Sequence, residues 1–213
     1  FSVVDGLVQL DEVAKAAAAD GQGALALTDS AAMFGAVRFY KAARGQGVKP
    51  IVGVDAWISN DTDRDSPHRL LLLAMDHAGY LRLCQLVSRS WIDNQHRGRA
   101  EMRLDWFDGD GSGGLIALSA ASQGEIGAQL AQGNTEAARA SAERLARLFP
   151  DRFYIELQRA GRAGEDALVR AGTRLAIDLG LPVVATHPVQ FVARGDFRAH
   201  EARVCIAEGY TLA

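Results

Sequence analysis

Short runs of mostly apolar residues recur along the chain and alternate with longer amphipathic stretches. Each run has the length of a buried strand and is continuous rather than alternating, which is typical of parallel strands covered on both faces. The runs cover residues 24–28, 51–58, 69–75, 114–119, 153–157 and 182–186. We therefore predict six strands of a mainly parallel sheet.

The stretches between these runs have the apolar spacing of helices. Tyr80, Leu83 and Val87, for example, recur on one face of a helix. Glycines follow several of the stretches, as Gly21 follows a helix that Asp11 can cap. The predicted helices cover residues 11–20, 31–44, 80–91, 134–148, 168–179 and 197–207.

Strands that alternate with helices predict an α/β fold. Because the helix at 11–20 precedes the first visible strand, we expect one further strand before Phe1. Seven strands come close to the eight of a closed barrel. We predict a single domain over residues 1–213, a distorted seven-stranded β/α (TIM-like) barrel whose first strand precedes this chain. An open, doubly wound sheet is the alternative architecture.

Two polar stretches, 60–67 and 94–103, predict loops. The second carries Arg97, Arg99 and Arg103, which could contact a phosphate backbone. A solvated loop is the simpler interpretation.

Composition narrows the partners and the compartment. Hydrophobic residues make up 48% of the chain and the formal net charge is -3, so we expect little direct binding of nucleic acid. Cys84 and Cys205 lie in apolar, helix-like stretches, which predicts buried free thiols rather than a disulfide. The longest apolar run, 70–75, is far shorter than the about 20 residues that cross a bilayer. We expect a cytoplasmic protein that does not contact a membrane.

Polar residues at the ends of the predicted strands are candidates for chemistry, because barrel enzymes place their sites there. A metal-dependent hydrolase needs several carboxylates and imidazoles that converge. Each candidate also has a simpler role, as Asp29 could cap the helix expected from Ala31. Motifs for a phosphate loop, a dinucleotide fold and a nucleophile elbow are missing from the sequence. The candidates are Asp5, Asp29, Asp55, His68 and His187.

Several segments, taken in order, match a known pattern. They are FSVVDG at 1–6, ALALTD at 24–29, FGAVRFYK at 34–41, GVKPIVG at 47–53, GLIALS at 114–119, DRFYIELQ at 151–158, LPVVAT at 181–186, and AHE followed by GYTL at 199–212. These segments resemble the PHP (polymerase and histidinol phosphatase) domain of bacterial DNA polymerase III alpha subunits. The resemblance implies a PHP-type barrel in the N-terminal region of a replicative DNA-directed DNA polymerase, a nucleotidyltransferase. It also implies a separate proofreading exonuclease subunit that docks on this region.

Intact members of that family hold a cluster of metal ions for phosphoester hydrolysis. By resemblance, Asp5, Asp55 and His68 occupy ligand positions, and a His-x-His pair belongs before Phe1. The remaining positions hold side chains that are poor ligands or none. They are Ser30, Ala121, Ala160, Pro188 and Gln190.

We therefore expect no catalytic residue, no cofactor and no metal, with Asp5, Asp55 and His68 as vestigial ligand positions that lie close together. One weakly held cation is the alternative. The resemblance then implies a non-catalytic scaffold and docking platform for the exonuclease, joined to the remainder of the polymerase. The rival is an active metal-dependent phosphoesterase, either a 3′–5′ exonuclease or a pyrophosphatase. A free-standing sugar- or histidinol-phosphate phosphatase is a third possibility.

Overall fold

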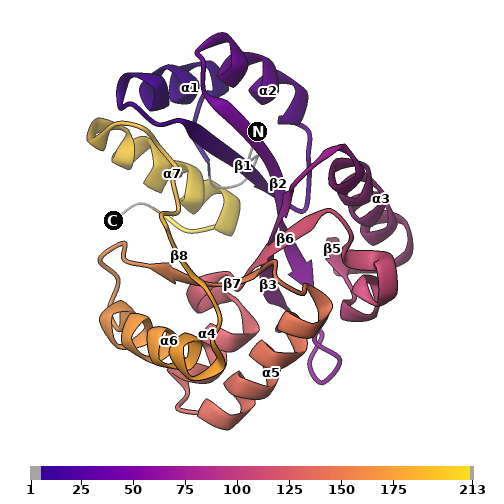
Figure 1. Cartoon of the computed structure of the whole chain (residues 1–213). Coiled ribbons are helices and arrows are strands. Elements are labelled where there is room, and N and C mark those ends of the chain that lie inside the picture. Colours follow the sequence, from indigo (N-terminus) through magenta and orange to yellow (C-terminus); the bar gives the residue numbers. More distant parts are fainter. Residues whose placement is uncertain (1–5, 212–213) are drawn as a thin grey trace. The chain divides into compact units, whose positions relative to one another are not determined.

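A computed structural model describes residues 6–211 of the chain as a mixed α/β structure (Figure 1). The chain divides into two compact units, which are described separately. The terminal unit comprises residues 1–29, 33–52 and 188–213, and the central unit comprises residues 30–32 and 53–187. The single domain predicted for residues 1–213 stays a prediction.

The terminal unit is built around two helices that pack on each other. Their buried contact includes Leu10 and Ala17 from the first helix and Phe39 and Ala43 from the second. Lys49 N–H donates to Gly23 O at 2.9 Å where the two strands of this unit begin to pair. The elements are α1 (Leu10–Ala19), β1 (Ala24–Ser30), α2 (Ala36–Gly45), the start of β2 (Lys49–Ile58), η4 (Arg194–Asp196) and α7 (Phe197–Glu208).

The central unit holds the larger part of the sheet, in the strand order β4-β5-β2-β3-β6-β7-β8. Figure 1 shows α3, α5 and α6 on the outer side of its strands. Besides the end of β2, its strands are β3 (His68–Ala74), β4 (Gln95–His96), β5 (Arg99–Met102), β6 (Leu115–Leu118), β7 (Phe153–Gln158) and β8 (Val183–Thr186). Its helices are α3 (His77–Asp93), η1 (Leu104–Phe107), η2 (Gly109–Ser112), η3 (Ala121–Gln123), α4 (Glu125–Ala131), α5 (Thr135–Leu148) and α6 (Glu165–Leu179).

The strand register assigns each side chain of the central sheet to one of two faces, because directly paired residues point the same way. One face, the core face, is apolar and closely covered. It includes Val54, Ala56, Leu70, Leu72, Ala117, Phe153 and Ile155, each at most 2% exposed. The other face carries the polar residues and is called the Asp55 face. It includes Asp55, Trp57, Arg69, Leu71, Leu118, Tyr154, Glu156, Gln158 and Thr186.

All six predicted strands and all six predicted helices are confirmed in the described residues, with shifted ends. The sheet was predicted to be mainly parallel, and β3 departs from this pattern because it runs antiparallel to both β2 and β6. The reason is the connection from β2 to β3, residues 59–67, which contains no helix. A parallel return needs a longer crossover, whereas a short loop returns the chain antiparallel.

Two other local predictions are wrong. Residues 94–103 are not a loop, because they form the paired strands β4 and β5. The arginines of this stretch are engaged in ion pairs, as between Arg97 and Asp65 at 3.0 Å and between Arg103 and Asp105 at 3.0 Å. The helix expected from Ala31 begins at Ala36 with Gly35 as its N-cap, so Asp29 is not its cap.

Both cysteines are free, as predicted, but they are only partly buried rather than buried, because each lies in a helix with one side open to solvent. Among residues 6–211, no helix is long and apolar enough to cross a membrane.

Candidate functional site

Asp55 of β2 is bound by an arginine from the neighbouring strand. The register pairs Trp57 with Arg69, and Asp55 lies two residues before Trp57 on the same face of β2. Arg69 Nε donates to Asp55 Oδ1 at 2.8 Å, and Arg69 Nη2 donates to Asp55 Oδ2. The guanidinium carbon also lies 4.2 Å from the centre of the Trp57 ring. Both carboxylate oxygens of Asp55 are therefore engaged by one planar cation.

His68 does not join this group. It pairs with Ile58, and alternation along the strand places it on the core face, opposite to Asp55. The prediction that Asp55 and His68 lie together is therefore wrong, because a shift of one residue along a strand changes the face. The third vestigial position, Asp5, lies outside the described residues.

The loop that follows β7 holds Ala160, where the family resemblance expects a histidine ligand. Glu165, at the start of α6, binds this loop through one oxygen. Its Oε2 accepts the backbone N–H groups of Ala160, Gly161 and Arg162 at 2.7, 2.8 and 3.0 Å. Burial raises the pKa of Glu165, but these N–H donors outweigh it and hold the pKa below its usual range. The Glu165 carboxylate is therefore ionised, and it holds the loop through these three hydrogen bonds. This role was not predicted from the sequence.

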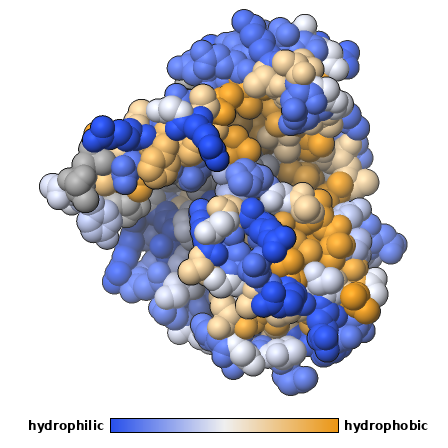
Figure 2. All heavy atoms as spheres, turned by 90° about the vertical axis from the view of Figure 1, so that its left-hand side faces the viewer, coloured by the Kyte–Doolittle hydropathy of each residue, from blue (hydrophilic) through white to orange (hydrophobic). Residues whose placement is uncertain are grey.

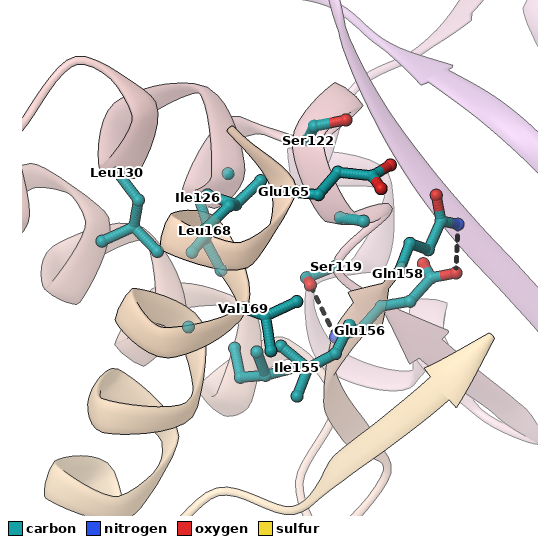
Figure 3. A pocket seen from close by; sticks show the side chains of 14 residues that line it. Ser119, Ser122, Ile126, Leu130, Ile155, Glu156, Gln158, Glu165, Leu168 and Val169 are labelled. Carbon is teal, nitrogen blue, oxygen red and sulfur yellow. Dashed lines mark hydrogen bonds between the residues drawn. The ribbon is translucent and has the colours of Figure 1, made fainter. Parts of the chain in front are cut away.

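A buried carboxylate also occupies the Asp55 face at β7. Glu156 is 3% exposed, and its Oε1 accepts a hydrogen bond from Gln158 Nε2 at 3.0 Å and one from Thr186 Oγ1. Its backbone N–H donates to Ser119 Oγ at 2.9 Å (Figure 3). Its Oε2 is buried without a hydrogen-bond partner among the described residues. A glutamate inside the apolar run at 153–157 was the sequence signal for this cluster.

A pocket lies beside Glu156, between α4, α6 and β7 (Figure 3). Its polar lining includes Ser119, Ser122 and Glu165, and its apolar lining includes Ile126 and Leu168. The lining therefore combines hydrogen-bonding groups with an apolar surface.

The remaining candidates are distant from Asp55 in sequence and belong to other segments of the chain. Asp29 is 9% exposed, and its Oδ2 lies close to Gly35 at the start of α2. Gln190 O accepts the backbone N–H of Leu7 at 2.8 Å. His187 follows β8 and is exposed.

Comparison with known families decides the assignment. The model of the PHP domain family matches residues 1–160. The chain belongs to the PHP domain family. Relatives that match this PHP domain over its whole length are DNA polymerase III subunit alpha of Neisseria meningitidis serogroup A, at 45% identity, and of Escherichia coli K12, at 39%. The same subunit of Pseudomonas aeruginosa matches at 44%. The chain spans about a fifth of the length of these relatives, 18–19%.

Two solved structures share the fold of this PHP domain. An amidohydrolase from Chromobacterium violaceum, with bound sulfate and no metal, superposes with a TM-score of 0.55 at 16% identity, over 95% of this chain and 94% of that chain. A proposed metal-dependent phosphoesterase from Bifidobacterium adolescentis superposes with a TM-score of 0.51 at 10% identity, over 95% and 93%. These likenesses confirm the predicted α/β fold of the PHP type, and the sheet of the described residues fits a partial barrel.

The metal cluster implied by the family does not fit the side chains that the structure describes. Among residues 6–211, no group of three or more His, Cys, Asp or Glu side chains is placed to hold a metal ion. Ala121 and Ala160 carry no donor atom in their side chains, and Asp55 is bound to Arg69. A zinc ion that acts in hydrolysis needs about three protein ligands and one open position. We therefore derive no hydrolytic step from this site.

Proposed function

We propose that this PHP domain is the N-terminal region of a DNA polymerase III alpha chain, a DNA-directed DNA polymerase that replicates DNA in the cytoplasm. The proposal is supported by relatives of that name, which match the entire chain at 39–45% identity. Because the chain spans about a fifth of their length, we assign nucleotide addition to the remaining part of the polymerase.

Within that polymerase the PHP domain acts as a non-catalytic scaffold. The observation that carries this proposal is the chemistry of the ligand positions. Ala121 follows β6 and Ala160 follows β7, and neither offers a ligand atom. His68 lies on the core face, away from Asp55. The rival, an active metal-dependent phosphoesterase, would need these positions to converge on an ion.

The scaffold also provides the docking surface for the proofreading exonuclease subunit. We assign this contact to α2 and the residues just before it, where Phe34, Val37 and Tyr40 are 78%, 62% and 51% exposed. Phe34 and Val37 line a groove together with Asp11, Arg38, Lys41 and Ala42. Clusters of exposed apolar side chains mark contact sites with other proteins. Figure 2 shows that hydrophobic side chains gather in patches on the face it draws.

Replacing Phe34 by aspartate is expected to weaken binding of the exonuclease subunit at least about tenfold, because a buried aromatic anchor contributes much of an interface's affinity. The melting temperature should not change, since Phe34 is exposed in the free domain. The measurement is a calorimetric titration of the purified exonuclease subunit into the wild-type chain and the variant.

The matched control is Ile177→Asp, which places the same charge at an apolar residue on α6 that is 74% exposed. It should leave the affinity unchanged. If Phe34→Asp and Ile177→Asp bind equally well, the exonuclease does not dock on α2. If the wild-type chain does not bind the exonuclease, the docking role is wrong.

A further inference from the structure

We propose that the Arg69 guanidinium is a built-in cation, which takes the place of a metal ion at Asp55 and ties β3 to β2. This inference rests on the proposed non-catalytic role and names what fills the former site. It assigns a specific function to an arginine that the ligand pattern of the family does not include.

The strand register makes the pair possible. Arg69 and Asp55 lie on the same face of adjacent antiparallel strands, offset diagonally by two residues. A long side chain can cover this diagonal distance. The two hydrogen bonds, from Nε to Oδ1 and from Nη2 to Oδ2, use the planar fork of the guanidinium. A fork of this kind matches a carboxylate in both geometry and charge.

The surroundings hold the guanidinium in place. The side chains of Arg69 and Asp55 are only 14% and 22% exposed. Trp57 presents its ring to Arg69, with 4.2 Å between the guanidinium carbon and the ring centre. A cation over an aromatic face is attracted by the ring and loses orientational freedom. Arg69 is thus fixed by the carboxylate and by the indole.

A metal ion at Asp55 would bind the same two carboxylate oxygens that the guanidinium uses. A divalent cation beside Arg69 would also be repelled by its charge. Removing the guanidinium leaves a carboxylate that is largely buried and has lost its cation. A largely buried carboxylate that has lost its neighbouring positive charge is destabilised, so it should attract a cation from solution.

The test is a thermal unfolding experiment on the chelated chain, with and without about 1 mM Mn²⁺, because binding to the native state alone raises its stability. Arg69→Met removes the charge and keeps an apolar stem against Trp57. We expect no effect of Mn²⁺ on the wild-type chain. Arg69→Met should melt several degrees lower, and Mn²⁺ should restore at least half of the loss.

The Mn²⁺ effect should disappear in Arg69→Met/Asp55→Asn, which lacks the carboxylate. Arg103→Met is the matched control, because Arg103 binds the exposed Asp105 at 3.0 Å, so Mn²⁺ should not change its melting temperature. Should Arg69→Met fail to fold, Arg69→Gln replaces it. Direct binding is measured by the loss of the free Mn²⁺ electron spin resonance signal.

The outcomes separate this inference from the proposed function. The built-in cation is wrong if Arg69→Met has the melting temperature of the wild type. It is also wrong if Mn²⁺ does not change the melting temperature of Arg69→Met while the wild type binds no Mn²⁺. In either case the scaffold role is unaffected. A wild-type chain that binds Mn²⁺ through Asp55 overturns both.

Discussion

Replacing Glu101 by alanine is expected to lower the free energy of unfolding by about 3 kcal/mol, because it removes a fully buried carboxylate that is paired with two arginines. Glu101 lies in β5 and is completely buried. Ser59 Oγ and Arg64 Nη2 donate to its Oε2, both at 2.9 Å. Arg99 Nε and Nη2 donate to its Oε1 at 3.0 and 2.8 Å. The substitution leaves two guanidinium groups without this carboxylate.

The pH dependence of this contribution follows from the pKa of Glu101. Burial raises the pKa, but Arg99, Arg64 and Ser59 outweigh it and hold the pKa below its usual range. The carboxylate therefore stabilises the fold above its unfolded pKa of about 4.3, and the contribution is lost as the pH falls through the lower folded pKa. The difference between the wild type and Glu101→Gln should be largest near pH 7 and should shrink in acid.

Urea unfolding followed by circular dichroism measures both effects, at pH 7 and below pH 4. Glu143→Ala is the control, because Glu143 is an exposed glutamate on α5 and its removal should cost little. A loss below about 1 kcal/mol for Glu101→Ala at pH 7 would show that the network is not buried as described.

Replacing Gly79 by alanine is expected to lower the free energy of unfolding by about 2–3 kcal/mol, because no room exists for a methyl group. The first turn of α3 is anchored by Asp76, whose Oδ1 accepts the Gly79 N–H at 2.8 Å. A Cβ on Gly79 would lie 1.9 Å from Gly114 O, a backbone atom that also accepts the N–H of Met75. The helix must therefore move away from the strand β6 that follows Gly114.

The matched control is Gly23→Ala, where a Cβ would meet no atom within 4 Å. It should leave stability unchanged or raise it slightly, since alanine restricts the unfolded chain. Chemical denaturation of both variants tests the prediction. Equal stability of Gly79→Ala and Gly23→Ala would mean that α3 does not approach Gly114 as closely as described.

The strands of this domain could be predicted because a buried strand is encoded by a continuous run of apolar residues in the local sequence. A run such as Leu70–Leu73 is apolar at every position, so its strand character does not depend on distant partners. The direction of that strand depends on the connection before it. Residues 60–67 are predicted to form a loop, and a loop of this length is too short for a parallel crossover, so the antiparallel direction of β3 could also have been predicted.

The candidate site was predicted less well, because its geometry depends on register and on distant partners. His68 and Arg69 are neighbours in sequence, but only Arg69 shares the face of Asp55. Choosing between them requires a strand register that is known to one residue. The partners of Glu101 include Arg64, 37 residues earlier in the chain. No local pattern in the sequence marks such a pair.

The central claim, a PHP domain without metal-dependent hydrolysis, is tested most directly by metal analysis of the chain after chelation and incubation with Mn²⁺ or Zn²⁺. The same preparation is assayed on a generic phosphomonoester and on a DNA 3′ end. We predict well under one equivalent of metal and no hydrolysis above background, because the ligand positions lack donors and Arg69 engages Asp55. Two or more tightly bound ions, or hydrolysis that is abolished by Asp55→Asn or His68→Ala, would contradict the account.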